Sequence, residues 1–168
     1  SGIWENIIHS EEDELPEETR SLITEYWYPK LIKLLNEQKD SALTYFLPPK
    51  KNFVTANLRP AQLSEEVVTP VFLIKSQKNN IELSCHVQVN GTEVGLEENE
   101  WPGNMLFKYA DTFYNWNRQE DIAEVERFSG RPVITIPSED WPGYLQKEII
   151  PLTKEYKVKF DKTLVHEV

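Results

Sequence analysis

Cys85 and His86 could support nucleophilic catalysis, because they place a thiol and a base side by side in the chain. Such catalysis requires the base to reach the thiol in an accessible, electropositive setting. Both residues lie in a segment, Ile81 to Val89, in which apolar and polar residues alternate. Neighbouring strand residues point to opposite faces of a sheet. We therefore expect Cys85 to be a buried structural thiol and His86 to face solvent.

Metal chemistry has two candidate residue sets. Zinc needs three or four Cys or His ligands, but His9, His86 and His166 are far apart in the chain. Glu155-Tyr156-Lys157 has the E-x-K form of nucleases that bind metal through strand carboxylates, but no convincing upstream aspartate accompanies it. The sequence contains neither a phosphate-binding glycine loop nor a G-x-S-x-G motif. We therefore assign no catalytic residue, metal or cofactor, and keep a carboxylate hydrolase or nuclease as a third hypothesis.

Basic residues in the middle of the chain are candidates for contact with nucleic acid or a protein partner. They are Lys50, Lys51, Arg59, Lys75 and Lys78. Lysines at sheet edges also prevent aggregation, so these residues have a structural explanation too. Phe53 and Phe72 could stack on bases. Two Trp-Pro-Gly segments could present Trp101 and Trp141 as anchors for a protein partner, although core packing is the commoner role of tryptophan.

The formal net charge of the 168-residue chain is −10, and it is unevenly distributed. Residues 1–40 carry ten acidic and four basic side chains, and residues 91–128 carry nine acidic and three basic ones. Residues 41–90 carry three acidic and five basic side chains, whereas residues 129–168 carry six of each. Acidic surface disfavours a large nucleic-acid footprint. We expect the isolated chain to bind DNA weakly, with a Kd above about 10 µM at physiological salt.

The first part of the chain is predicted to be helical over residues 15–47, after an acidic, partly flexible lead-in over residues 1–14. Pro16, followed by two glutamates, is typical of a helix start. Apolar residues then recur at helical spacing to about residue 39. Pro29 lies inside this run and should kink or split the helix near Tyr28. Ser41 to Leu47 is predicted to add one helical turn.

Residues 52–116 are predicted to form a sheet. The expected strands are Asn52 to Leu58, Val67 to Lys75, residues 80–89, Thr92 to Leu96, residues 104–109 and residues 112–116. The alternation over residues 80–89 indicates a half-buried strand. Asn90-Gly91 is the preferred pair for a tight hairpin turn. An antiparallel meander follows from this pattern.

Residues 118–160 are predicted to mix helices and strands. Arg118 to Phe128 should be a helix that buries one apolar face, and Val133 to Ile136 a short strand. A second helix should begin with Ser138 as its N-cap and end at Pro151. The alternation in Tyr156 to Phe160 indicates a final strand. Together these elements predict one α+β domain over residues 15–168, with a mainly antiparallel sheet and helices packed on one face.

A pattern of apolar positions with a few polar marks runs through residues 70–160. Its parts are Pro70 to Ile74, Ile81 to Val94, Tyr114 to Arg118 with Asp121, Glu124 and Phe128, and then Val133 to Ile136, Trp141 to Pro151 and Tyr156 to Phe160. This pattern resembles the associated domain of bacterial Swi/Snf-type helicase-like ATPases, which lies between a zinc-binding module and two ATPase lobes. The sequence lacks the cysteine-rich module and the ATPase motifs, so the resemblance implies an accessory domain without activity of its own.

We therefore expect a non-catalytic accessory domain that positions or regulates the motor lobes of a Swi/Snf-like DNA-dependent ATPase. Its partners would be the motor domains of the same chain or of another protein, and its acidic blocks would suit a basic motor surface. The alternative is a free-standing acidic interaction module, such as an inhibitor that mimics DNA. A single cysteine and the lack of an apolar run of about 18 residues predict a cytoplasmic protein without a membrane partner.

Overall fold

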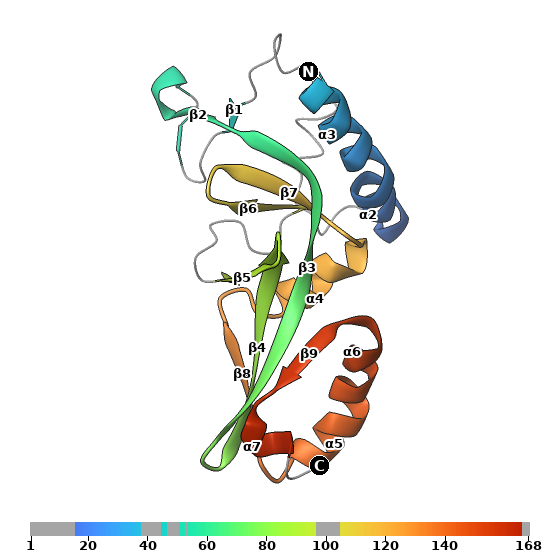
Figure 1. Cartoon of the computed structure of the whole chain (residues 1–168), viewed down its shortest axis with the longest axis vertical. Helices are drawn as coiled ribbons and strands as arrows, with labels where there is room; N and C mark the ends of the chain where they lie inside the picture. Colours follow the sequence, from blue (N-terminus) through green and yellow to red (C-terminus); the bar gives the residue numbers. More distant parts are fainter. Residues whose placement is uncertain (1–15, 38–44, 47–50, 53, 97–104, 166–168) are drawn as a thin grey trace.

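The computed structural model describes residues 16–37, 45–46, 51–52, 54–96 and 105–165. Its centre is a long hairpin of β3 (Gln62–Gln77) and β4 (Asn80–Val89). The two strands pair antiparallel from Thr69↔Gln88 to Gln77↔Asn80. The residues of β4 alternate between buried and partly exposed, which confirms the predicted half-buried strand. β3 runs through most of the length of the molecule (Figure 1).

Each strand of the hairpin has two further partners along its outer edge. Along β3, β7 (Thr112–Trp116) and β9 (Lys157–Phe160) pair in parallel at successive levels. Along β4, β5 (Thr92–Gly95) and β8 (Val133–Pro137) pair antiparallel. β6 (Leu106–Tyr109) adds to β7. The α+β class is confirmed, and the sheet is mixed because its long strand has two parallel partners.

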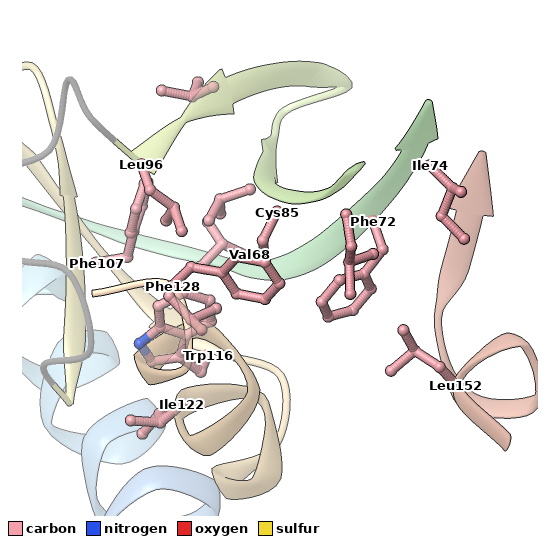
Figure 2. Close-up of a cluster of buried hydrophobic side chains, with 14 of the residues drawn as sticks. Val68, Phe72, Ile74, Cys85, Leu96, Phe107, Trp116, Ile122, Phe128 and Leu152 are labelled. Carbon is pink, nitrogen blue, oxygen red and sulfur yellow. The ribbon is translucent and has the colours of Figure 1, made fainter. Parts of the chain in front are cut away.

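One face of the sheet holds the main core, which Figure 2 shows around Val68, Phe72 and Trp116. Phe72 is fully buried, and Trp116 is 1% exposed. The helices on this face are α4 (Gln119–Glu126), α5 (Trp141–Tyr144), α6 (Ile150–Glu155) and α7 (Lys162–Val165). The predicted apolar face of α4 is confirmed, since Ile122 and Val125 are fully buried.

The N-terminal helical segment packs on the opposite face. It consists of α2 (Glu17–Leu22), a π-helical turn (Ile23–Trp27) and α3 (Tyr28–Glu37). On β7, Asn115 is the neighbour of the core residue Trp116, so its side chain points to the other face. Asn115 Nδ2 donates to the backbone oxygen of Thr24 at 2.6 Å. The helices therefore cover both faces of the sheet rather than the single face that we expected.

Pro29 and Pro151 each follow a π-helical turn, Ile23–Trp27 and Leu145–Ile149 respectively. Proline has no N–H to donate, and its ring clashes with the carbonyl of the preceding turn. The residue before each proline donates instead to a carbonyl five residues back, Tyr28 to Ile23 and Ile150 to Leu145. The helix interruption predicted at Pro29 takes this form. Pro151, expected to end its helix, lies inside a helical segment that continues to Glu155.

The hydrogen bond of Asn115 follows directly from Pro29. Tyr28 bonds to Ile23, so the next N–H in the chain would have to satisfy the oxygen of Thr24. The next residue is Pro29, which has no N–H. The backbone oxygen of Thr24 is thus left without a partner in its own helix, and Asn115 on β7 supplies the donor.

Three further local predictions are wrong. Tyr45–Phe46, predicted helical, form β1, which pairs with β2 (Arg59–Pro60). The segment Asn52 to Leu58 contains a 3-10 turn at Thr55–Asn57 where a strand was predicted. Ser138 does not cap the second helix, because its hydroxyl donates to the Asn79 carbonyl in the β3–β4 turn at 2.6 Å. The predicted lead-in over residues 1–14 lies outside the described residues.

The predicted turn at Asn90-Gly91 is confirmed. Asn90 and Gly91 both have positive φ, as a tight hairpin turn between β4 and β5 requires. Within the described ranges, no helix is long and apolar enough to cross a membrane.

Replacement of Asn115 by alanine should lower the free energy of unfolding by about 2 kcal/mol, because it leaves the buried oxygen of Thr24 without a donor. The cost should shrink by about half or more in a Pro29→Ala background, where residue 29 regains an N–H that can bond within the helix. Urea unfolding of the four proteins measures this coupling. Equal costs of Asn115→Ala in both backgrounds would contradict the causal link to Pro29.

Candidate functional site

The predicted basic residues do not form one patch. Lys51 and Arg59 are exposed near the start of β3, whereas Lys75 and Lys78 are exposed at its far end. A strand of 16 residues spans about 50 Å. Lys50 lies outside the described residues. The structure thus separates Lys75 and Lys78 from Lys51 and Arg59.

The aromatic side chains proposed for binding have other roles where they are described. Phe72 is fully buried in the core, so it cannot stack on a base. Trp141 begins α5 and packs half-buried against the main core. Trp101 and Phe53 lie outside the described residues. Trp141 therefore has the structural role that is common for tryptophan.

Cys85 and His86 take the positions that the alternation predicted. Cys85 is 3% exposed in the main core, and its burial raises the pKa of the thiol far above the ordinary value. His86 lies on the opposite face, with Nδ1 4.0 Å from Glu93 Oε2. The two side chains cannot act together as nucleophile and base.

A polar cluster joins the start of α4 to the start of β9. Asp121 is 1% exposed and accepts a hydrogen bond from the Arg118 backbone N–H at 3.0 Å. The Tyr156 hydroxyl donates to Asp121 Oδ1 at 2.8 Å. Burial raises the pKa of Asp121, although both hydrogen bonds favour the ionised carboxylate. Burial and the same carboxylate raise the pKa of Tyr156. The cluster fixes α4 against β9.

The E-x-K segment takes part in this cluster through Glu155. Arg118 Nη2 lies 3.7 Å from Glu155 Oε2, and Arg118 Nε lies 3.7 Å from Asp121 Oδ1. The one aspartate near Glu155 in this cluster is thus engaged in capping α4. In the part of the chain that the structure describes, no three His, Cys, Asp or Glu side chains are grouped closely enough to hold a metal ion.

Residues of β3, β4, β5 and β9 form a cluster of charged side chains on the sheet face opposite the main core. Lys157 and Lys159 project from β9 beside Val71 and Leu73 of β3. Lys159 Nζ donates to Glu93 Oε1, and this hydrogen bond lowers the pKa of Glu93, with further lowering by His86 and Lys157. The alternation over residues 156–160 predicted the strand correctly. The alternation contains no information on which strand β9 pairs with. Its pairing with β3 places Lys157 and Lys159 in line with Lys75.

The outer surface of the N-terminal helical segment exposes large apolar side chains. Leu22 is 51% exposed, Tyr26 45%, Trp27 46% and Leu34 50%. The rings of Tyr26 and Trp27 are perpendicular, with centroids 5.2 Å apart, and Lys30 Nζ donates to the Tyr26 hydroxyl at 2.8 Å. We call Leu22, Tyr26, Trp27 and Leu34 the aromatic stripe. Scattered single apolar residues are ordinary on a surface, whereas contiguous apolar patches are typical of interaction sites. The contact between Tyr26 and Trp27 makes this part of the helix the candidate interaction surface.

The sequence carries a signal for this stripe. Apolar residues of the helical segment lie on two sides, so one sheet cannot bury them all. The inner side carries Ile23, Tyr28 and Ile32, each no more than 5% exposed. A helix that is apolar on opposite sides is normally covered on both.

Comparisons with protein-family models, with curated proteins and with solved structures find no match to this chain.

Replacement of Tyr156 by phenylalanine should lower the free energy of unfolding by about 2 kcal/mol at pH 7, because a buried carboxylate loses a donor. The pKa of Asp121 is already raised in the folded state, so its ionisation lowers stability as pH rises above the usual aspartate range. Loss of the hydroxyl should enlarge that effect. The cost should therefore be smaller at pH 3 than at pH 7.

Urea unfolding at both pH values measures this difference. Tyr144→Phe is the matched control, since the Tyr144 hydroxyl accepts only a long bond, 3.4 Å, from exposed Arg127. The control should change stability by less than about 0.5 kcal/mol. An equal cost of Tyr156→Phe at pH 3 and pH 7 would contradict an ionised, hydrogen-bonded Asp121.

Proposed function

We propose that this chain is a non-catalytic accessory domain of a Swi/Snf-like DNA-dependent ATPase and that it docks on the motor lobes through the aromatic stripe. The single observation that supports this docking surface is that the N-terminal helical segment has apolar residues on both its inner and its outer side. Its inner side contacts the sheet, and its outer side leaves Tyr26 and Trp27 nearly half exposed. The resemblance of residues 70–160 to the associated domain of such ATPases supports the identity of the partner.

The aromatic pair has the properties of an interface anchor. Tryptophan and tyrosine are the residues most enriched where truncation costs binding energy. The perpendicular contact between Tyr26 and Trp27 restrains both rings before a partner arrives. A restrained side chain loses less conformational entropy on binding. The stripe is therefore prepared to enter an apolar pocket.

The charges beside the stripe favour a basic partner surface. Glu18 and Glu25 lie one helical turn from Leu22, and Glu37 lies one turn from Leu34. All three glutamates are exposed, as are Lys30 and Lys33 on the same segment. Acidic residues in the rim of an interface steer a basic partner and set its orientation. The partner surface that fits is apolar at its centre and basic at its edge.

The test is a pull-down of the two ATPase lobes of the Swi/Snf-type protein from the same organism, with residues 1–168 as bait, and an assay of DNA-stimulated ATP turnover. We expect capture and altered turnover. A Tyr26→Ala, Trp27→Ala double variant should weaken binding at least about tenfold, or 1.4 kcal/mol.

Val133→Ala with Ile150→Ala is the matched control, because both residues are exposed apolar side chains distant from the N-terminal segment in sequence. The control should bind the lobes as the unaltered chain does. If the lobes neither bind nor change their turnover, the accessory-domain proposal is overturned. Equal losses in both double variants would overturn the stripe as the docking surface.

A further inference from the structure

Lys157, Lys159 and Lys75 lie on the sheet face opposite the main core, and Lys78 follows in the β3–β4 turn. Lys157 and Lys159 lie at the levels of Val71 and Leu73, Lys75 follows two residues later on β3, and Lys78 occupies the β3–β4 turn. Successive levels along a strand differ by about 7 Å for every two residues. We call Lys157, Lys159, Lys75 and Lys78 the lysine row, which extends over about 20 Å. All four side chains are exposed.

The row lies on the side of the sheet opposite the main core. Lys75 is paired with Glu82 of β4, and Val71 with His86, so these residues share one face with Lys157 and Lys159. The N-terminal helical segment packs on this face near the start of β3, where Asn36 Nδ2 donates to the Leu63 carbonyl. The lysine row occupies the other end of β3, about 30 Å away along the strand.

The chemistry of the face fits a phosphate backbone. A linear series of cations neutralises successive phosphates, of which duplex DNA presents one negative charge per about 1.7 Å of axis. Besides the charged side chains, this face carries Ser84 and Gln88, whose side chains can form hydrogen bonds. Among the described residues of β3, β4 and β9 that share this face with the lysines, there is no Phe, Tyr or Trp, the residues on which single-stranded bases stack. Duplex DNA is therefore favoured over a single strand.

We infer that the lysine row binds the phosphate backbone of duplex DNA without sequence preference. The inference deepens the proposed function and rests on it for its biological setting, because an accessory domain of a DNA-dependent ATPase works beside its duplex. The row is a different surface from the aromatic stripe, so the two can be tested separately.

Two carboxylates on the face limit the affinity. Glu93 is bonded to Lys159, and Glu82 lies directly opposite Lys75. Each carboxylate competes with phosphate for a lysine and so weakens binding. The acidic remainder of the chain adds long-range repulsion. Binding is consequently weak at physiological salt and becomes measurable when salt is low.

The experiment is fluorescence anisotropy of a labelled 20-base-pair duplex of mixed sequence, titrated with residues 1–168 at salt concentrations from 20 to 200 mM. Four phosphate contacts predict that log K falls against log salt with a slope of about −3.6. Lys157→Gln with Lys159→Gln should weaken binding about tenfold at the lowest salt and make the slope shallower by about 1.8. Lys157→Gln alone, which keeps the Lys159–Glu93 ion pair, should give about half of each effect.

A variant that binds more tightly is included because a gain of affinity, unlike a loss, cannot result from unfolding. Glu93→Gln removes the carboxylate that competes with phosphate for Lys159, so it should tighten binding several-fold at every salt concentration. Lys147→Gln with Lys154→Gln is the matched control, because it makes the same charge change on exposed residues of the helical segment that covers the opposite face. The control should change the slope little.

Three results would overturn the inference. They are no binding at the lowest salt, an unchanged slope in the Lys157, Lys159 variant, or an equal loss in the Lys147, Lys154 control. Preference for a single strand over the duplex would show that bases, not only phosphates, are bound, and would overturn the choice of ligand. Loss of capture by the motor lobes with intact DNA binding would refute the proposed docking alone.

Discussion

The antiparallel pairing of β3 with β4 is the interaction on which the other elements depend. Nine residue pairs join the two strands, and the outer edge of each strand then accepts two shorter strands end to end. β7 and β9 come from distant parts of the chain, yet both take their position from β3. A fully buried Phe72 at the centre of β3 contacts the rings of Phe128, which follows α4, and Tyr156, which directly precedes β9. The hairpin thereby aligns the start of β9 with the end of α4.

Proline shapes this molecule through the carbonyl groups that it leaves unpaired. Pro29 and Pro151 each follow a π-helical turn, but the freed carbonyls have different surroundings. At Pro151 the corresponding residue, Gln146, is exposed, so water can supply the hydrogen bond. At Pro29 the corresponding residue, Thr24, is fully buried, and Asn115 must supply it. The carbonyl that proline leaves unpaired is thus hydrated in the helix that contains Pro151, whereas in the helix that contains Pro29 it forms a tertiary contact.

The sequence predicts the parts of this fold that depend on local patterns. The alternation in β4, the Asn90-Gly91 turn and the apolar face of α4 are each properties of neighbouring residues, and each is confirmed. Pairing between distant strands has no such local signal, so the parallel partners of β3 were not foreseen. The same reason explains the binding surfaces. Lys75 and Lys78 were identified from sequence, whereas their alignment with Lys157 and Lys159 depends on the register of β9 with β3.

The contact between the N-terminal helical segment and the sheet has a consequence for how the molecule opens. Its apolar part is a small separate cluster of Ile23, Tyr28 and Met105. Within the described residues, the buried Thr24 hydroxyl and Asn115 side-chain oxygen have no hydrogen-bond partner there. Protein segments with few buried contacts exchange their amide hydrogens at lower free energy than the core does. The N-terminal helical segment should therefore unfold as a separate cooperative unit. A partner that binds the outer side of this segment only while the segment is packed on the sheet also stabilises the contact between the segment and the sheet, through linkage.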